Sequence, residues 1–497
     1  MGFILSEHKQ GQIRLDNSIA SDYFDQTKGE LTLLAASFAT YNGLRAKEFR
    51  KGQYCYGVHH EQEGRQITVS PGYFIGVDWL LEGKRYIQVE PKVNSKMAGY
   101  FSDQLAVEEE NGTTAADIES RAKSEIANGL VQHVEINYLK MLLDAMADST
   151  VAKECIDLVQ IDWDAQRVLI PQEQDQLTPF LVVQFLQLLK QIVQKGLKKS
   201  YYKVEENLNS RVKGKILVGQ QIKQNVLKNR FTKTYCSYQV FGEDSTENRF
   251  LKKVLRFCSS YVENNETIFK GNQAAIHHLI RYAQPAFEQV GTDIAERELR
   301  HVKHNPFFKE YKEAVRIGQF ILKQFAYNIT ATTAKLVETP PFWIDMPRLF
   351  ELYVYQKLLQ ANGHDTQKIR YQFSTYGNAL DILIKDRDRS MIIDAKYKLH
   401  YQHGHVHEDM RQVAGYARLK KVRQELGMLD ADDKHIDCLI IYPDLESGID
   451  LDASKDQEFK LIAEDRKWRD GVSAIKPYYK IFKLGVLLPI VRAKDSF

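Results

Sequence analysis

Two aspartates and one lysine in the last third of this 497-residue chain are the side chains whose types and spacing best suit a chemical reaction. Asp381 interrupts the apolar run 380–384. Asp394 ends the apolar run that begins at position 391, and Lys396 follows two residues later. An unpaired buried carboxylate is costly, so strands that keep two of them need a cation nearby. A hard divalent metal ion suits oxygen ligands of this kind.

The spacing also predicts how these side chains meet. Side chains two apart on a strand share a face, so Asp394 and Lys396 point the same way. A charged turn at 385–390 joins the two runs into a hairpin, which brings Asp381 beside them. Two acids and a lysine fit metal-assisted hydrolysis of a phosphodiester, with the lysine orienting or activating the attacking water. A structural salt bridge between Lys396 and one aspartate is the alternative, and these three residues alone leave both interpretations open.

The elements predicted around these residues alternate between helix and strand. Apolar side chains at helical spacing predict a helix that begins near Asp345. Apolar runs predict strands at 379–384, 391–396 and 436–442, and a further helix is expected over about 408–426. The order helix, strand, strand, helix, strand is that of a compact α/β unit.

Asp381 and, thirteen positions later, Asp394-Ala395-Lys396 resemble the PD-(D/E)xK nuclease motif, with Leu380 in place of the nominal proline. The resemblance implies that Asp381, Asp394 and the Ala395 carbonyl bind Mg²⁺, with Mn²⁺ as an alternative. It also implies that Lys396 handles the attacking water.

Two further features stand in the order that this superfamily shows. Glu351, on the helix before, occupies the place of an additional acid, which implies that it holds a metal-bound water or a second ion. Gln412 and Tyr416 resemble the accessory QxxxY element, which implies that they orient the site or touch phosphate. Several motifs in the right order are more specific than one short motif.

Longer segments resemble the McrC family. The segment 342–351 resembles the opening of its nuclease domain, and Ile393-Asp394-Ala395-Lys396-Tyr397 matches its form of the second motif. Segments 211–216 and 243–249 resemble its basic segment and the start of its central helix, so the resemblance covers roughly 205–497. It implies the nuclease subunit of a McrBC-type (5-methylcytosine) restriction system. Such a subunit cuts double-stranded DNA together with a separate McrB-like AAA+ ring that hydrolyses GTP or ATP.

The sequence contains no G-x-x-x-x-G-K-[ST] motif, so a translocating motor would have to be another polypeptide. The resemblance places docking on the AAA+ ring in about the first 200 residues. Aromatic and basic side chains there are a candidate protein interface or else an ordinary hairpin surface: Tyr41, Arg45, Lys47, Arg50, Lys51 and Tyr54. Two other functions stay open, a non-enzymatic DNA-binding adaptor that regulates an AAA+ ring and a free-standing RecB-like exonuclease.

A basic stretch between Lys195 and Lys233 has only Glu205 and Glu206 as opposing acids. Nucleic acid is the natural partner of such a stretch, although a solvated helical surface explains it equally well. The candidate DNA contacts are Lys213, Lys215, Lys228 and Arg230.

The fold class predicted from these patterns is α+β with several domains. We expect a β-rich N-terminal region at 1–115, a mainly helical middle region at 116–335 and an α/β nuclease domain at 336–497. Gly76 is among the residues that punctuate the N-terminal strands, and the polar stretch 107–114 is predicted to be an exposed loop or linker.

Composition excludes several classes of protein. Hydrophobic residues make up 43% of the chain, which rules out a disordered protein, and no apolar stretch approaches a membrane span. Five scattered cysteines without a CxxC pair predict a reduced, cytoplasmic protein that uses thiols as small apolar residues. The cluster His400, His403, His405 and His407 fits a polar loop near the DNA better than a zinc site.

Overall fold

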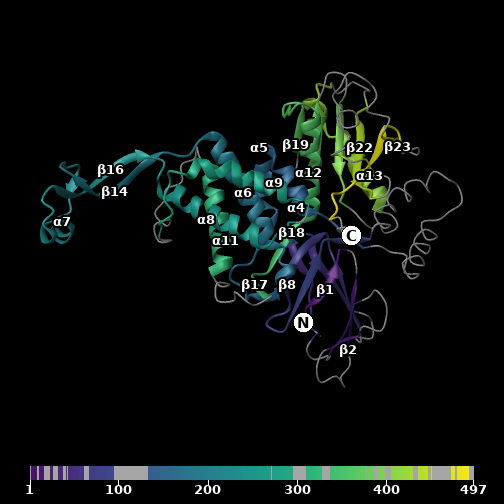
Figure 1. The fold of residues 1–497 in the computed structure, drawn as a ribbon. Helices are drawn as coiled ribbons and strands as arrows, with labels where there is room; N and C mark the ends of the chain where they lie inside the picture. The colour runs from purple at the N-terminus through teal and green to yellow at the C-terminus, as the bar shows by residue number, and fades with distance from the viewer. Residues whose placement is uncertain are drawn as a thin grey trace, which may run out of the picture. The chain divides into compact units, whose positions relative to one another are not determined.

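A computed structural model describes residues 2–7, 10–15, 23–25, 32–36, 41, 43–60, 66–94, 133–269, 271–294, 309–326, 336–375, 378–385, 390–397, 405–428, 435–445, 449, 451, 472–475 and 478–491 (Figure 1). The chain forms two compact units. Unit 1 joins Met1–Leu177 to Thr333–Phe497, and unit 2 is Thr178–Thr332. The first and last of the three regions expected from the sequence therefore belong to one unit. The polar stretch 107–114 lies outside the described residues.

Unit 1 begins with two β-sheets, as the alternating N-terminal pattern predicts. One sheet has the order β1-β9-β8-β18-β12, formed by Phe3–Ser6, Arg85–Glu90, Phe74–Leu81, Phe342–Asp345 and Val159–Ile161. The other has the order β3-β4-β2-β7-β6-β5, formed by Tyr23–Asp25, Thr32–Ala36, Gly11–Leu15, Gln66–Pro71, Gln53–His60 and Lys47–Arg50. Alternate side chains of both sheets share one hydrophobic core, which includes Phe3, Ile13, Ile67 and Val89.

Strand β18 joins the C-terminal part of the chain to this N-terminal sheet. It pairs antiparallel with β8 on one side and with β12 on the other. Gly76 lies inside β8, opposite Trp343, and a Cβ there would lie 2.1 Å from the Phe342 carbonyl oxygen. Gly76 is therefore no strand boundary, and it permits the close approach of two strands. Trp343 Nε1 donates a hydrogen bond to Asp78 Oδ2 at 3.0 Å across the same pair.

The helix predicted near Asp345 forms directly after β18. It is α12 (Met346–Ala361), and the Asp345 side chain accepts a hydrogen bond from the Arg348 backbone N–H at 3.0 Å, which is an N-cap. Helices α4 (Tyr138–Ala145) and α5 (Ser149–Glu154) contact α12 within unit 1. Two short strand pairs, β10 with β11 and β13 with β17, complete this part: Lys92–Asn94, His133–Glu135, Val168–Pro171 and Leu336–Thr339.

The C-terminal α/β part of unit 1 has its helices and strands in the predicted order. Its six-stranded sheet has the order β19-β20-β21-β22-β24-β23, formed by Ile369–Thr375, Asn378–Lys385, Ser390–Ala395, Asp437–Pro443, Ile481–Val486 and Ser473–Ala474. The expected long helix is divided into α13 (His405–Ala417) and α14 (Lys420–Glu425). These helices connect β21 to the parallel strand β22 and bury Met410, Val413 and Val422 in one core with the sheet.

Unit 2 consists of helices and a β-sheet arm. The helices α6 (Leu177–Lys195), α8 (Thr246–Asn264), α9 (Gln273–Ala283) and α11 (Lys309–Ala326) form the main body (Figure 1). Ser245 is the N-cap of α8, and its side chain accepts a hydrogen bond from the Asn248 backbone N–H. Gly318 of α11 lies against Phe250 and Val254 of α8, because a Cβ at position 318 would approach both side chains to 2.9 Å.

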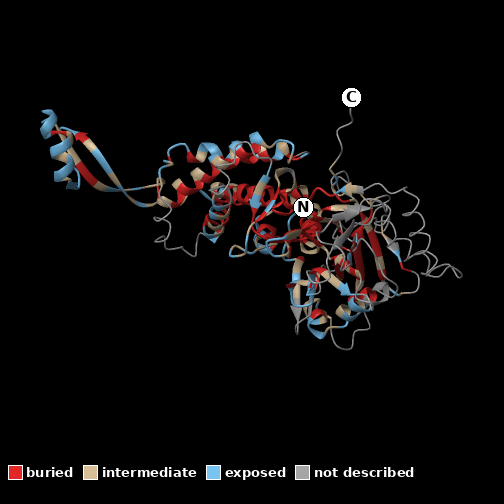
Figure 2. Ribbon diagram, turned by 90° about the horizontal axis from the view of Figure 1, so that it is seen from below, coloured by how far each residue is buried: buried red, intermediate tan, exposed pale blue. Residues whose placement is uncertain are grey.

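The basic stretch contains strands as well as short helical segments. Strands β14 (Ser200–Asn209) and β16 (Lys233–Gly242) pair antiparallel over ten residue pairs, and β15 (Lys215–Ile216) adds to β16. We call residues 200–242 the arm and residues 210–232 the arm tip, which also contains α7 (Val218–Gln224). Most side chains of β14 and β16 are exposed or half-buried (Figure 2), and only Leu208, Cys236 and Ser237 of these two strands are buried.

The cysteines follow the expectation drawn from composition. All five are buried free thiols: Cys55, Cys155, Cys236, Cys258 and Cys438. Burial raises the pKa of the Cys438 thiol to about 12, which keeps it protonated and unreactive. Among the described residues, no helix combines the length and apolar character needed to cross a membrane.

Candidate active site

Asp381 and Asp394 lie side by side on the central strands of the C-terminal sheet. Ile382 of β20 pairs with Ile393 of β21, so the two aspartates occupy the next positions of the antiparallel ladder. The Ala395 backbone N–H donates a hydrogen bond to Asp381 Oδ2 at 2.8 Å. The hairpin predicted from the two apolar runs therefore brings both carboxylates together.

Lys396 connects this pair to α13. Its Nζ lies 3.0 Å from Asp394 Oδ2 and donates a hydrogen bond to Gln412 Oε1 at 3.1 Å. Gln412 Nε2 in turn donates to the Tyr416 hydroxyl oxygen at 2.7 Å. Four of the predicted residues thus form one continuous polar chain from β21 to α13.

Glu351 joins the site from α12. Its Oε2 accepts a hydrogen bond from the Tyr371 hydroxyl at 3.2 Å. Burial first, and then the nearby charge of Asp345, raises the pKa of Glu351 to about 7. The charge of Glu351 also raises the pKa of Asp381, after burial as the larger cause. The predicted acids therefore lie close enough for the charge of one to raise the pKa of another.

At Asp394 and Lys396, burial and the neighbouring charges shift the pKa in opposite directions. Burial raises the pKa of Asp394, and Lys396 lowers it, with burial the larger effect. Burial alone would lower the pKa of Lys396, but the carboxylates of Asp394, Asp381 and Asp409 raise it above its ordinary value. Lys396 therefore carries a positive charge and compensates part of the buried negative charge.

Sequence reasoning missed two residues of this site. Asp409 is buried on α13 with its Oδ1 3.9 Å from Lys396 Nζ. It stands three positions before Gln412, a helical spacing that could have indicated it. Tyr371 lies on β19, which was not among the predicted strands, so no pattern in the sequence indicated its contact with Glu351.

The site fits a divalent cation in its chemistry. Among the described side chains, no group of three or more His, Cys, Asp or Glu residues is arranged so that it could hold a metal ion as it stands. However, Asp381 and Asp394 are adjacent acids whose pKa values burial raises, and Lys396 Nζ pairs with Asp394 Oδ2. Two acidic side chains and one backbone carbonyl are suitable oxygen ligands for Mg²⁺. The histidine side chains at 400, 403, 405 and 407 lie outside what the structure describes.

The four basic residues predicted to contact DNA all lie in the arm tip. Lys213, Lys215, Lys228 and Arg230 are exposed, and the tip contains no acidic residue. The tip also exposes apolar side chains, including Val218, Leu227 and Phe231. Exposed apolar side chains in a cluster mark an interaction surface, so the tip combines positive charge with an apolar surface.

Amide side chains hold the arm tip together in place of a hydrophobic core. Asn225 is fully buried and exchanges two hydrogen bonds with Asn207 of β14, at 2.8 and 2.9 Å. Gln221 of α7 accepts from the Tyr235 backbone N–H at 2.7 Å. Gly214 has a φ of +68°, and a Cβ there would lie 2.4 Å from the Ser237 carbonyl oxygen, so glycine is required where the tip returns to β16.

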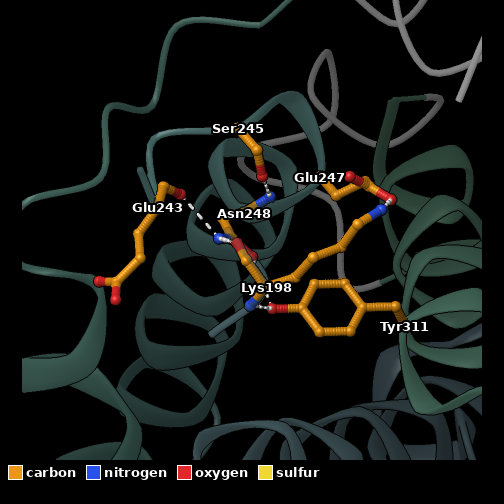
Figure 3. Close-up of polar contacts among 6 residues, drawn as sticks. All are labelled: Lys198, Glu243, Ser245, Glu247, Asn248 and Tyr311. Atoms are coloured by element: carbon orange, nitrogen blue, oxygen red, sulfur yellow. Dashed lines mark hydrogen bonds and ion pairs between the residues drawn. The ribbon is translucent and has the colours of Figure 1, made fainter. Parts of the chain in front are cut away.

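A buried polar cluster, which we call the arm root, holds the two ends of the arm (Figure 3). Asn248 Nδ2 of α8 donates to the Lys198 carbonyl at 3.0 Å and to the Glu243 carbonyl at 2.7 Å. The Tyr311 hydroxyl of α11 donates to Asn248 Oδ1 and accepts from the Lys198 N–H, both at 2.8 Å. Lys198 and Glu247 add an ion pair at 2.6 Å. One asparagine thus binds the chain just before and just after the arm.

The candidate protein interface near the N-terminus is only partly exposed. Tyr41 is fully buried in the core, so its place in that interface is wrong. Lys47 forms an ion pair with buried Asp78 at 2.9 Å, and Arg50 donates to the Asp157 carbonyl at 3.2 Å, so both stabilise unit 1 itself. Tyr54 is half exposed.

Comparisons with known proteins identify the family of the chain. Residues 81–429 match the family described as McrBC 5-methylcytosine restriction system component. A half-complex of Thermococcus gammatolerans McrB AAA+ hexamers with bound McrC is 12% identical, with 100% of this chain and 97% of that chain covered and a TM-score of 0.35. The cryo-EM structure of the T. gammatolerans McrBC complex is also 12% identical, with coverages of 73% and 88% and a TM-score of 0.27. No curated protein matches the chain. Because the family match spans more than half of the sequence, this chain belongs to the McrBC 5-methylcytosine restriction system component family.

Proposed function

We propose that the chain is the Mg²⁺-dependent endonuclease subunit of its restriction system, with a PD-(D/E)xK site that hydrolyses DNA phosphodiester bonds. The observation that carries this proposal is the contact set of Asp381, Asp394 and Lys396 on adjacent strands, with Lys396 bound to both Asp394 and Gln412. A purely structural salt bridge needs one acid per lysine. Here three carboxylates raise the pKa of one lysine, which leaves a surplus of negative charge.

Each residue of the site has its own role in the proposed reaction. Asp381, Asp394 and the Ala395 carbonyl would hold Mg²⁺, which supplies charge to the scissile phosphate and acidifies a bound water. Lys396 is held in its charged form, so it orients the water and stabilises negative charge on the phosphate rather than removing a proton. Gln412 and Tyr416 fix the position of the Lys396 ammonium. Glu351, with a pKa near 7, can exchange a proton at neutral pH.

The partners in this proposal are double-stranded DNA and a McrB-like AAA+ ring. The family name describes one component of a restriction system, and the sequence contains no phosphate-binding loop that could drive movement along DNA. The arm tip offers positive charge for DNA phosphates and apolar side chains for a protein partner. Docking of the ring on the first 200 residues stays part of the proposal.

The test is cleavage of circular plasmid DNA by the full chain with Mg²⁺ and a McrB-like AAA+ protein. Asp394→Ala and Lys396→Ala should each lower the cleavage rate by orders of magnitude, because each removes a group that contacts the metal or the water. Asp394→Ala should leave the melting temperature unchanged or higher, since it relieves repulsion between buried carboxylates. Asp164→Ala, the same change at an exposed position, is the matched control.

The outcomes separate the three candidate functions. Wild-type cleavage by Asp394→Ala would refute the assignment of the site. Absence of cleavage by the wild type with its ring would favour a non-enzymatic adaptor. Efficient cleavage of linear DNA alone, with circular DNA left intact, would favour an exonuclease that needs DNA ends.

A further inference from the structure

The N-terminal sheet contacts the nuclease motif itself, through the residue that follows Lys396. Glu7 comes directly after β1, and its Oε2 accepts a hydrogen bond from the Tyr397 hydroxyl at 3.0 Å. These two residues are 390 positions apart in the sequence, and both side chains are buried. The Glu7 backbone N–H donates to the Glu90 carbonyl at 3.2 Å, which fixes Glu7 to β9.

Tyr397 is enclosed by the three elements that meet at the site. Its ring packs against Phe350 of α12, with ring centroids 5.7 Å apart, and Phe350 precedes Glu351. Its ring also meets Tyr73 of the N-terminal region edge-on, at 6.4 Å. The backbone beside it is fixed as well, because the Lys396 N–H donates to the Ile441 carbonyl of β22 at 2.8 Å. Tyr397 is therefore packed on several sides directly beside the Ala395-Lys396 backbone.

We propose that Glu7 is a positioning residue of the nuclease site, which holds Tyr397 and thereby the backbone that carries the Ala395 carbonyl and Lys396. This inference rests on the proposed nuclease function of that backbone. A buried carboxyl group is costly to place in a core, and its Oε1 has no hydrogen-bond partner among the described residues. The contact with Tyr397 explains why a side chain as costly for stability as Glu7 occupies this place. The N-terminal sheet then forms part of the catalytic unit in addition to any role in docking.

The experiment compares three variants of the full chain. Glu7→Met removes both carboxyl oxygens at similar length, Glu7→Gln keeps an acceptor for the Tyr397 hydroxyl, and Tyr397→Phe removes that hydroxyl. Glu82→Met, in an exposed turn between β8 and β9, is the matched control. Two quantities are measured: the turnover rate and KM for plasmid DNA with the ring, and amide hydrogen exchange at 395–397 in the chain alone.

We expect Glu7→Met and Tyr397→Phe to lower the turnover rate roughly 10-fold or more, as supporting residues of metal sites do, with KM for DNA unchanged. A variant that combines Glu7→Met with Tyr397→Phe should lose no more turnover than either single variant, because both changes remove the same hydrogen bond. Glu7→Met and Tyr397→Phe should both speed amide hydrogen exchange at 395–397. Glu7→Gln should retain most of the turnover rate and most of the protection from exchange.

Unchanged exchange and turnover in Glu7→Met, or a Glu7→Gln variant as impaired as Glu7→Met, would overturn the inference. The exchange measurement keeps it separate from the proposed function. If the wild type does not cleave DNA, the nuclease proposal fails, and exchange at 395–397 alone decides whether Glu7 positions this backbone.

Discussion

At the scale of single residues, the site is made of buried charges that only partly cancel. Asp381, Asp394 and Glu351 all have raised pKa values with burial as the first cause, and Lys396 is the charged group that faces them. A stable core would not collect acids in this way, because each one loses hydration without a matched partner. The site contains more carboxyl groups than the one lysine that faces them, which favours the proposed cation site over a structural salt bridge.

Glu7 predicts a specific dependence of stability on pH. Burial raises its pKa from an ordinary value of 4.5 to about 8, and the bond from Tyr397 lowers it by less. The folded chain therefore keeps a proton that the unfolded chain releases between these two values. The stability that this proton contributes is complete below the unfolded pKa and is lost as the pH rises through the folded pKa. The ionisable groups nearby, Tyr397 and Tyr73, stay protonated in this range because burial raises their pKa values.

The measurement is the melting temperature of the wild type and of Glu7→Gln from about pH 5 to about pH 9. Glutamine does not titrate, so we expect the wild type to lose stability relative to Glu7→Gln as the pH rises. A difference in melting temperature that stays constant over this range would contradict the raised pKa of Glu7.

At the scale of elements, the arm depends on its root for its direction. Asn248→Leu should lower the free energy of unfolding by about 1–3 kcal/mol, because it leaves the buried carbonyls of Lys198 and Glu243 without their donor. Exchange of the backbone amides at both ends of the arm should become faster. Asn264→Leu, an exposed position of the same helix, is the control and should change neither quantity. Equal melting temperatures for the two variants would show that the root does not restrain the arm.

The arm tip predicts two separable kinds of binding. Neutral replacements of Lys213, Lys215, Lys228 and Arg230 should weaken DNA binding regardless of sequence. Each lost phosphate contact should reduce the slope of log affinity against log salt by about 0.9. Leu227→Ser with Phe231→Ser should leave this slope unchanged and weaken co-sedimentation with the AAA+ ring. An unchanged salt slope in the charge variant would identify the basic residues as a solvated surface.

At the scale of the whole molecule, unit 1 is built from both ends of the sequence. Strand β18 lies between β8 and β12, and its Trp343 donates to Asp78. A chain that begins near Asp175 lacks β8 and β12, so it loses the strands on both sides of β18. Removing the N-terminal region therefore also disturbs the part of unit 1 that precedes the C-terminal sheet.

A fragment that begins at Thr333 should therefore fail to fold by itself, because β18 loses the strands on both sides. Replacing residues 201–241 with a short Gly-Ser turn should leave the rest of unit 2 folded, since the arm root is retained. Circular dichroism melts of both chains test this. A cooperative transition of the Thr333 fragment would contradict the dependence of the nuclease sheet on the N-terminal strands.

The sequence by itself determined the helices and strands that local patterns of side chains specify. Continuous apolar runs predicted the strands β20, β21 and β22, and apolar side chains at helical spacing predicted α12. The acid–acid–lysine spacing brought Asp381, Asp394 and Lys396 together, because a hairpin has few registers that bury both apolar runs.

Only the tertiary structure decided the features that depend on distant partners. Few side chains of the arm strands are buried, and the arm tip is held by side-chain amides from segments that are separated in the sequence. Glu7 and Asp409 read as ordinary surface acids in the sequence, yet both are buried near Lys396 or Tyr397. Pairing of β18 with β8 likewise follows from packing between segments more than 250 residues apart, for which a local sequence pattern carries no information.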